Sequence, residues 1–210
     1  MENILVAGAN GTTGKQIVAL LHKSENFNPI AMVRKEEQRT FFKNQNIETV
    51  LGDLTNNVDA AFSSTIDRVL FAAGSGGKDV IGVDQEGAKK MIDASKKANV
   101  KKFVMLSSMG ADKPEEAMQL VEYLKAKHNA DEYLKTSGLE YSIVRPGTLT
   151  NEDQVAKIEL APKLNKRGEI SRADVAQTLV HALESNTATN ASFEIIKGQQ
   201  SITEALSQVK

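Results

Sequence analysis

Cysteine is absent from the 210-residue chain. This absence excludes disulfides, zinc–thiolate sites and thiol nucleophiles together, and it is typical of a protein of the reducing cytoplasm. Long apolar runs are missing as well, since no stretch approaches the roughly 18 residues that a membrane span needs. The N-terminal segment MENILVAGANGTTG has no basic region before its short apolar run, which argues against a signal peptide. We therefore expect a cytoplasmic protein without a membrane span.

An excess of charge of one sign is also missing, because 26 lysines and arginines are balanced by 27 aspartates and glutamates. The formal net charge of −1 leaves no basic field that would hold nucleic acid or an anionic membrane surface. The chain contains no G-x-S-x-G nucleophile elbow and no H-E-x-x-H motif, and its three histidines lack the spacing of metal ligands. We expect a small-molecule substrate, no metal, and neither a nucleic-acid nor a membrane partner.

Short runs rich in valine, isoleucine and leucine alternate with longer amphipathic segments. This alternation is typical of an α/β fold, and nearly continuous apolar strands indicate a sheet that is buried on both faces. Right-handed crossovers then give a doubly wound, Rossmann-type parallel sheet with helices on both faces. Expected strands cover residues 3–8, 29–34, 47–51, 68–73, 102–107 and 140–145, and expected helices cover residues 14–23, 36–44, 85–98 and 115–137.

The alternation weakens after Pro146, but no long linker, internal repeat or low-complexity tract marks a second domain. Ser171, with Asp174 three residues later, resembles a capping box at the start of another helix. A last strand over residues 192–197 and a short helix complete the chain. We expect one domain over residues 1–210, in which residues 151–210 form a smaller C-terminal part.

Three glycines with the spacing G-x-x-G-x-x-G lie between the first expected strand and the first expected helix. Gly8 permits a tight turn, Gly11 lets the backbone approach a pyrophosphate, and Gly14 allows close packing of helix on strand. The free N–H groups and the positive dipole end of the helix then hold the phosphates. Because strand, glycines and helix coincide, the motif predicts a dinucleotide site. The expected binding residues of this segment are Gly8, Asn10, Gly11, Thr12, Thr13 and Gly14.

The residues after the second expected strand discriminate between the two nicotinamide dinucleotides. NAD sites place Asp or Glu there to accept from the ribose hydroxyls, whereas this chain has Arg34 and Lys35. A guanidinium binds a 2′-phosphate through two parallel hydrogen bonds and stacks on adenine, so we expect NADP(H). Two alternatives stay open: the two cations only decorate the next helix, or Glu36 or Glu37 reaches the ribose and the cofactor is NAD(H).

Small and polar residues follow the third and fourth expected strands, at the edge of the sheet where ligands of such folds bind. Asp53, next to Leu54, can accept a hydrogen bond from the adenine amino group. Ala72, Ala73 and Gly74 carry no large side chain that would block a dinucleotide. Each feature alone is ordinary turn chemistry, but together they indicate one cofactor groove.

The chain resembles the short-chain dehydrogenase/reductase superfamily, in particular its atypical NAD(P)H-binding branch of NmrA-like and biliverdin-reductase-B-like proteins. The resemblance covers nearly the whole chain and rests on GANGTTG at 8–14, LSS at 106–108, EYLKAKHNADEYLKTSGLEY at 122–141, YSIVRPGTLT at 141–150 and ISRADVA at 170–176. It implies a trio of catalytic residues and a loop beside the nicotinamide. The implied trio is Ser108, Tyr123 and Lys127, with Ser107 as the second candidate for the serine, and the implied loop is Pro146, Gly147 and Thr148.

The chemistry of the trio follows from its side chains. Tyr123 and Lys127 lie one helical turn apart, so both can project toward one site. A phenol has a pKa of about 10, and an ammonium about 4 Å away favours the phenolate by up to about 4 kcal/mol at an effective dielectric near 20. Tyr123 is then the expected general acid, Ser108 binds the same substrate oxygen, and Lys127 also contacts the nicotinamide ribose. The open alternative is a chance Tyr-x-x-x-Lys on a lysine-rich helix.

Two functional hypotheses follow. The first is an NADP(H)-dependent oxidoreductase that transfers a hydride to a small carbonyl, quinone or flavin-like acceptor beside residues 151–166. The shortness of that segment argues against nucleotide-sugar epimerases of the superfamily, which need a larger C-terminal lobe. The second is a non-catalytic, NmrA-like NADP(H)-binding redox sensor with a regulatory protein partner. Amphipathic helices on such a sheet are also compatible with a homodimer.

Overall fold

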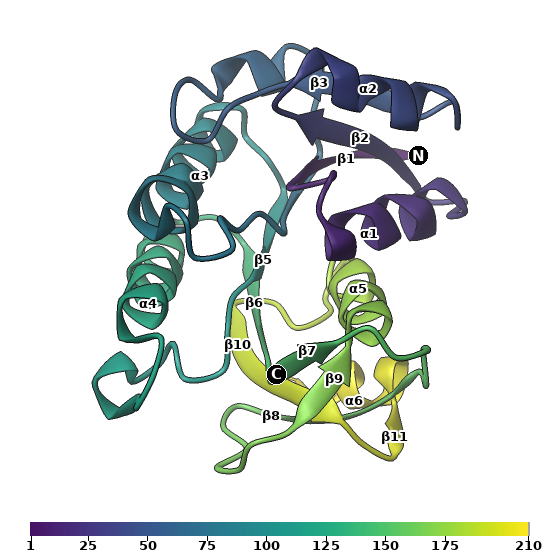
Figure 1. Cartoon of the computed structure of the whole chain (residues 1–210). Helices are drawn as coiled ribbons and strands as arrows, with labels where there is room; N and C mark the ends of the chain where they lie inside the picture. Colours follow the sequence, from purple (N-terminus) through teal and green to yellow (C-terminus); the bar gives the residue numbers. More distant parts are fainter. Residues whose placement is uncertain (210) are drawn as a thin grey trace.

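A run of parallel strands forms the centre of the computed structural model, which describes residues 1–209. The strands are β1 (Glu2–Ala7), β2 (Phe27–Val33), β3 (Glu48–Leu51), β4 (Arg68–Phe71), β5 (Lys102–Leu106), β6 (Tyr141–Pro146), β8 (Lys157–Ala161), β10 (Ala191–Lys197) and β11 (Gln200–Ser201). They form one nine-stranded sheet in the order β11-β8-β10-β6-β5-β4-β1-β2-β3 (Figure 1). All neighbours from β3 to β10 in this order are parallel, whereas β8 pairs antiparallel with β10 and with β11.

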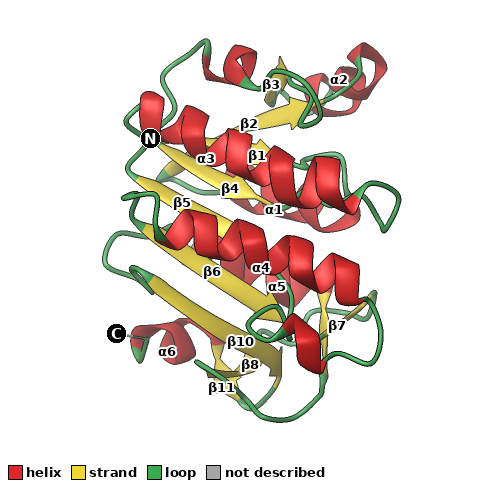
Figure 2. Ribbon diagram, turned by 90° about the vertical axis from the view of Figure 1, so that its left-hand side faces the viewer, coloured by secondary structure: helices red, strands yellow, loops and turns green. Residues whose placement is uncertain are grey.

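Helices cover both faces of this sheet. On one face lie α1 (Thr12–His22), α5 (Arg172–His181) and α6 (Ile202–Ser207), and Phe42 of α2 (Glu36–Lys43) joins their apolar cluster. On the other face lie α3 (Ala88–Lys97) and α4 (Val121–Lys135), which cross the front of the sheet in Figure 2. The predicted doubly wound α/β fold is therefore confirmed, with an antiparallel addition at one edge.

Strand β1 shows why the apolar runs form a two-sided core. Ile4 and Val6 point into the cluster around α1 and α5, whereas Leu5 and Ala7 point into the cluster around α3. All four side chains are fully buried, because successive residues of a strand face opposite sides of the sheet. The predicted strands up to residue 146 and the last predicted strand are confirmed to within two residues at each end.

Two of the predicted helices need correction. The helix predicted over residues 85–98 is an α-helix only from Ala88, and it follows a π-helix, η2 (Val80–Gly87). The helix predicted over residues 115–137 begins only at Val121, because Leu120 has the left-handed φ of 58° and interrupts the helical backbone. A short 3₁₀ turn, η3 (Pro114–Glu116), precedes this interruption.

The region after Pro146 contains elements that its weak periodicity did not reveal. β7 (Thr148–Thr150) and β9 (Glu169–Ser171) form a separate two-stranded parallel sheet, and β8 joins the main sheet. The predicted cap of the next helix is confirmed, since the Ser171 hydroxyl accepts from the N–H of Asp174 at 3.0 Å. Within residues 1–209, no helix is both long enough and apolar enough to cross a membrane.

Candidate dinucleotide-binding site

The turn after β1 needs glycine at two of its positions. Gly8 has a φ of +85°, and a Cβ on it would lie 2.6 Å from the Cα of Ala73, just beyond β4. A Cβ on Gly14 would overlap the carbonyl oxygen of Gly8 and lie 2.9 Å from the Cα of Ala9. The turn therefore packs backbone against backbone and leaves no room for side chains.

The N-terminus of α1 is free to bind an anion. Gly11 is its N-cap and contributes no side chain, and the first turn contains no acidic residue. The N–H of Gly11 donates to the carbonyl of Gly8 at 2.9 Å, which holds the turn against the helix. The N–H groups of the first turn, where Thr12 and Thr13 lie, have no partner within the helix, and the helix dipole favours negative charge there. This geometry fits a pyrophosphate.

A cavity of about 490 Å³ runs along the carboxyl ends of β1, β2, β3 and β4. This volume is within the range of small-molecule sites, and we call the cavity the cofactor groove. Nine predicted residues line it, namely Gly8, Asn10, Gly11, Arg34, Asp53, Leu54, Ala72, Ala73 and Gly74. Further lining residues are Met32, Val33, Gln38, Gly52, Thr55, Ser75, Lys78, Asp79 and Val83. The structure thus brings the ends of four separate strands to one groove.

Arg34 is positioned by a side chain that the sequence analysis did not single out. The Oε1 atom of Gln38 accepts from the N–H of Arg34 at 3.0 Å and from the N–H of Lys35 at 3.1 Å. These two hydrogen bonds join the first turn of α2 to the end of β2. Arg34 lines the groove with an exposed side chain, while the Lys35 ammonium lies 3.7 Å from Glu37.

The carboxylate of Glu36 has a partner of its own outside the groove. Nη1 of Arg39 lies 3.1 Å from both carboxylate oxygens of Glu36. The same guanidinium donates to the hydroxyl and the carbonyl of Thr49 on β3, at 2.9 and 3.0 Å. Among the described residues, neither Glu36 nor Glu37 lines the groove.

Asp53 presents an ionised acceptor to the groove. Its Oδ1 accepts from the N–H of Thr55 at 3.0 Å and from the Thr55 hydroxyl at 2.8 Å. These two hydrogen bonds lower the pKa of Asp53, and the positive charge of Arg34 lowers it further. Its second oxygen forms no hydrogen bond within residues 1–209, so it is available to a donor such as an amino group.

Lys127 of α4 does not line the groove, but its buried ion partner Asp84 contacts the groove wall. Its ammonium lies 3.3 Å from Oδ1 of Asp84 in η2 and donates to the carbonyl of Leu106 at 3.3 Å. Only 3% of Lys127 and 1% of Asp84 are exposed to solvent. The other carboxylate oxygen of Asp84 accepts from the N–H of Ser75 in the groove wall at 3.0 Å.

The structure brings two members of the predicted trio, Tyr123 and Lys127, together. The Lys127 ammonium lies over the ring of Tyr123, 5.7 Å from its centroid. Within residues 1–209, the Tyr123 hydroxyl forms no hydrogen bond and Ser108 makes none with it. The Ser108 hydroxyl instead donates to the carbonyl of Met109 at 3.4 Å.

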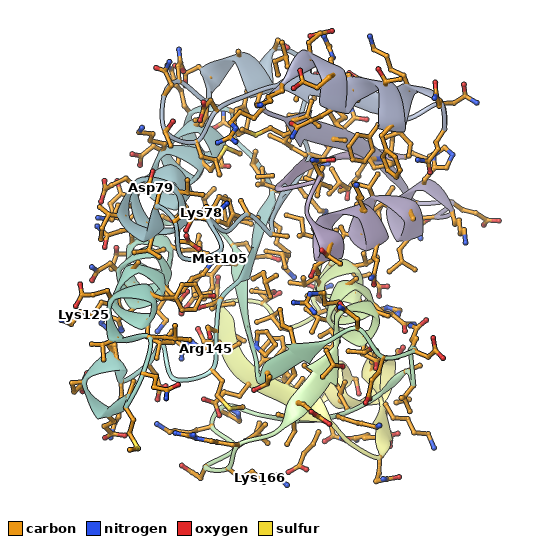
Figure 3. The ribbon with its side chains drawn as sticks, viewed as in Figure 1. Lys78, Asp79, Met105, Lys125, Arg145 and Lys166 are labelled. Atoms are coloured by element: carbon orange, nitrogen blue, oxygen red, sulfur yellow. The ribbon has the colours of Figure 1, made fainter. Side chains whose placement is uncertain are left out.

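Ser107 has a different environment from Ser108. Its hydroxyl donates at 2.9 Å to Oδ2 of Asp131 on α4, and the same oxygen accepts from Nε and Nη2 of Arg145 at 3.0 and 2.8 Å. Burial raises the pKa of Asp131, and the Arg145 guanidinium opposes this shift. Figure 3 shows Arg145 on the sheet side of α4 and Lys125 on its outer side. This buried cluster ties α4 to β5 and β6.

The predicted loop beside the nicotinamide lies next to the end of β5. The carbonyl of Pro146 accepts from the N–H of Met109 at 3.0 Å, one residue beyond Ser108. A Cβ on Gly147 would overlap the carbonyl of Gly168, and Thr148 begins β7 with an exposed side chain. The ends of β5 and β6 therefore form one continuous edge.

The segment after β7 is held by side chains from two distant elements. The carboxylate of Asp174 accepts from the N–H of Ala156 at 2.7 Å and from that of Val155 at 3.2 Å. Lys163 forms an ion pair with Asp112, in the segment between β5 and α4, at 2.6 Å. These contacts place residues 151–166 beside the loop that follows β5.

Several residues that shape this site have little or no signal in the sequence. Arg145 had the clearest signal among them, because a charged residue interrupts the apolar run YSIVRP. Asp131 lies one helical turn after Lys127 on the same face of α4, which was a weaker signal. Asp84 had no signal in the sequence, because the segment VDQEGAKK has the composition of an ordinary exposed helix start.

Residues 8–186 match the model of a protein family described as NAD(P)H-binding. The chain belongs to this NAD(P)H-binding family. The match agrees with the predicted resemblance to the atypical branch of the short-chain dehydrogenases/reductases. The glycine turn after β1 and the N-terminus of α1, which has no acidic residue in its first turn, are the parts of the structure that fit the dinucleotide.

Three proteins are reported as similar to this NAD(P)H-binding chain. The Bacillus subtilis protein YhfK, named an uncharacterized sugar epimerase, is 37% identical over 98% of this chain and 99% of its own length. A Bacillus halodurans structure, named as a candidate NAD-dependent epimerase/dehydratase, is 35% identical with a TM-score of 0.94, covering 99% of this chain and 100% of that one. Sanguinarine reductase of Eschscholzia californica is 34% identical over 73% of this chain and 58% of its own length.

Proposed function

We propose that the protein is an NADP(H)-dependent oxidoreductase that reduces a small carbonyl, quinone or flavin-like acceptor. The observation that carries this proposal is a groove at the carboxyl ends of β1 to β4, whose wall at Ser75 is bonded by Asp84, the ion partner of Lys127. Membership in the NAD(P)H-binding family and similarity to a protein named as a reductase support it. When bound, the cofactor supplies a hydride to the acceptor.

The preference for NADP(H) rests on the charges around the end of β2. Arg34 lines the groove, while Glu36 pairs with Arg39 and Glu37 lies near Lys35. A carboxylate that is already paired is a poor partner for ribose hydroxyls, and an exposed guanidinium is a good partner for a 2′-phosphate. We therefore assign Arg34 to the 2′-phosphate and Asp53 to the adenine amino group.

The chain has to supply one proton for each hydride that a carbonyl or quinone accepts. We assign this proton to the Tyr123 hydroxyl and the stabilising hydrogen bond to Ser108, beside the loop that begins at Pro146. Lys127 contacts the nicotinamide ribose in this assignment. Water then restores the proton to Tyr123.

A specific observation favours a second function, that of an NADP(H)-binding sensor without catalysis. The Lys127 ammonium is paired with Asp84 and faces the ring of Tyr123, an arrangement that gives the phenol no hydrogen-bonded base. A sensor would need only the groove and a surface for a regulatory protein partner. The sensor, this partner and a homodimer stay predictions.

Calorimetric titration with NADPH and NADH tests the cofactor assignment. We expect the wild type to bind NADPH more tightly, and Arg34→Ala to lose about 1.5–3 kcal/mol, or about ten- to a hundredfold, in NADPH affinity. Affinity for NADH should fall much less in this variant, because NADH has no 2′-phosphate. Lys43→Ala, which removes a cation at the other end of α2, is the control and should bind both nucleotides as the wild type does. Equal effects on both nucleotides would contradict the assignment.

A second measurement separates the enzyme from the sensor. Oxidation of NADPH is followed with carbonyl, quinone and flavin acceptors for the wild type and for Tyr123→Phe. We expect turnover of at least one acceptor by the wild type and a loss of about a hundredfold or more in Tyr123→Phe. A wild type that binds NADPH but reduces none of these acceptors supports the sensor.

A further inference from the structure

A single buried carboxylate, that of Asp84, joins the wall of the cofactor groove to helix α4. One of its oxygens accepts from the N–H of Ser75 at 3.0 Å, and the other lies 3.3 Å from the ammonium of Lys127. Ser75 lines the groove, whereas Lys127 belongs to the predicted catalytic trio. No other residue within 1–209 contacts both of these partners through one carboxylate.

The π-helix η2 holds Asp84 in this position. Asp79 caps its start by accepting from the N–H of Gly82 at 2.8 Å. At its end, a Cβ on Gly87 would lie 2.7 Å from the Cβ of Leu54, so η2 packs directly against a residue of the groove. Such π-helical turns are rare and occur frequently at functional sites.

Because Asp84 and Lys127 are both buried, each charge needs the other as its partner. Both side chains are almost completely buried, and a buried charge without a partner is costly. The fit around the carboxylate is tight, because a Cβ on Gly74 would lie 3.2 Å from Oδ1 of Asp84. The ammonium of Lys127 is therefore held in one place, and the backbone of Ser75 is held by the same carboxylate.

We propose that Asp84 is a positioning residue that fixes Lys127 and the Gly74–Ser75 wall of the groove relative to each other, and so places the nicotinamide half of the cofactor. This inference rests on the proposed function, in which Lys127 contacts the nicotinamide ribose. The adenine half of the groove, with Arg34 and Asp53, has its own supports in Gln38 and Thr55. Loss of Asp84 should therefore affect one half of the dinucleotide and leave the other.

Binding of NADPH and of 2′,5′-ADP, which carries only the adenine half, tests this separation. Asp84→Asn keeps the size of the side chain and removes its charge. We expect this variant to bind 2′,5′-ADP within about twofold of the wild type and NADPH about tenfold or more weakly, as for the loss of one hydrogen bond to a charged group. Glu86→Gln, in the same π-helix, removes an ion pair with Lys89 on the surface and should leave both affinities unchanged.

A double variant distinguishes positioning from a general loss of structure. Asp84→Asn combined with Lys127→Met leaves no unpaired buried charge at this place, so it reports on the coupling even where the single variant folds poorly. We expect the double variant to bind NADPH as Lys127→Met alone does, because the Asp84→Asn side chain still accepts from the N–H of Ser75 and the charge of Asp84 acts on Lys127 alone. Bound 2′,5′-ADP and the thermal unfolding midpoint show that each variant is folded.

The outcomes separate the two proposals. Asp84→Asn that weakens both ligands equally, or neither of them, would overturn the positioning role while the wild-type affinities still support the proposed function. A double variant much weaker than Lys127→Met would overturn it in the same way. A wild type that binds neither NADPH nor 2′,5′-ADP would overturn the proposed function and the positioning role together.

Discussion

The two halves that we propose for the cofactor site, an adenine half and a nicotinamide half, are supported by different kinds of contact. In the adenine half, the supporting contacts are local: Gln38 holds the N–H of Arg34 four residues before it, and Thr55 holds Asp53 two residues before it. In the nicotinamide half, Lys127 bonds the carbonyl of a residue 21 positions away, and Ser107 bonds a carboxylate 24 positions away.

Charged side chains also have different roles in the two halves. The charges of the adenine half are exposed or half-buried and available to a ligand, as at Arg34 and Asp53. The charges of the nicotinamide half are buried and neutralised by each other, as in the Asp84–Lys127 and Asp131–Arg145 pairs. Loss of a charge in the first half should therefore change affinity alone, whereas loss of a charge in the second half should also change stability.

The largest effect that we expect comes from breaking the buried pair of the nicotinamide half. Asp131→Ala leaves the Arg145 guanidinium buried without its partner, and this should lower the free energy of unfolding by about 3–5 kcal/mol. Urea unfolding followed by circular dichroism measures the change. Glu132→Gln removes an exposed pair with Lys135 on the same helix and should cost less than about 1 kcal/mol. Equal costs for the two variants would contradict the comparison.

An intermediate effect is expected in the glycine turn that we propose to hold the pyrophosphate. Gly14→Ala forces a methyl group against the carbonyl of Gly8, and overpacking of this kind should cost about 1–3 kcal/mol of stability. It should also abolish measurable binding of NADPH, because α1 moves away from the glycine turn. Calorimetry and thermal unfolding measure the two effects.

Gly138 provides the matched control for this substitution. It has a φ of +85°, but a Cβ on it would meet no atom within 4 Å. Gly138→Ala therefore introduces backbone strain of about 1–2 kcal/mol without a steric overlap, and NADPH binding should persist. Loss of binding in this variant as well would show that stability, not the glycine turn, limits binding.

The smallest effect is expected at the carboxyl group of Asp53. Two hydrogen bonds from Thr55 lower its pKa below the usual 3.8, so Asp53 contributes stability that is present above that value and is lost as the pH falls through the lower folded pKa. Thr55→Val removes the hydroxyl donor and keeps the backbone donor. Its Asp53 pKa, measured by carbon-detected NMR titration, should rise toward the usual value. An unchanged pKa would mean that the hydroxyl makes no contribution.

The sequence was sufficient to predict the fold and the strand ends that meet at the groove, since both depend on patterns within short stretches. Apolar strands, the glycine spacing and Arg34 at the end of a strand are each visible within a few residues, and the structure places them in one groove. The prediction for the catalytic trio was less complete. The spacing of Tyr123 and Lys127 puts their side chains near each other, but no local pattern indicates the carboxylate that pairs with the lysine, and the catalytic roles stay predictions.

Helix boundaries and the last third of the chain show the same limit. Leu120 adopts a left-handed backbone that nothing in its neighbourhood predicts, and β8 is a strand only because β10 and β11 lie beside it. Tertiary contacts decide such elements, because a short strand gains its hydrogen bonds from its neighbours and not from its own residues.

The sequence by itself determined the doubly wound sheet, its glycine turn and the positive charge of Arg34 directly after β2. Each of these follows from backbone sterics and from hydrophobic burial along one segment of chain. Only the tertiary structure decided that Asp84 meets Lys127 and that Asp131 meets Arg145. These pairs form because burial makes an unpaired charge costly, and which charges are buried together depends on how distant segments pack.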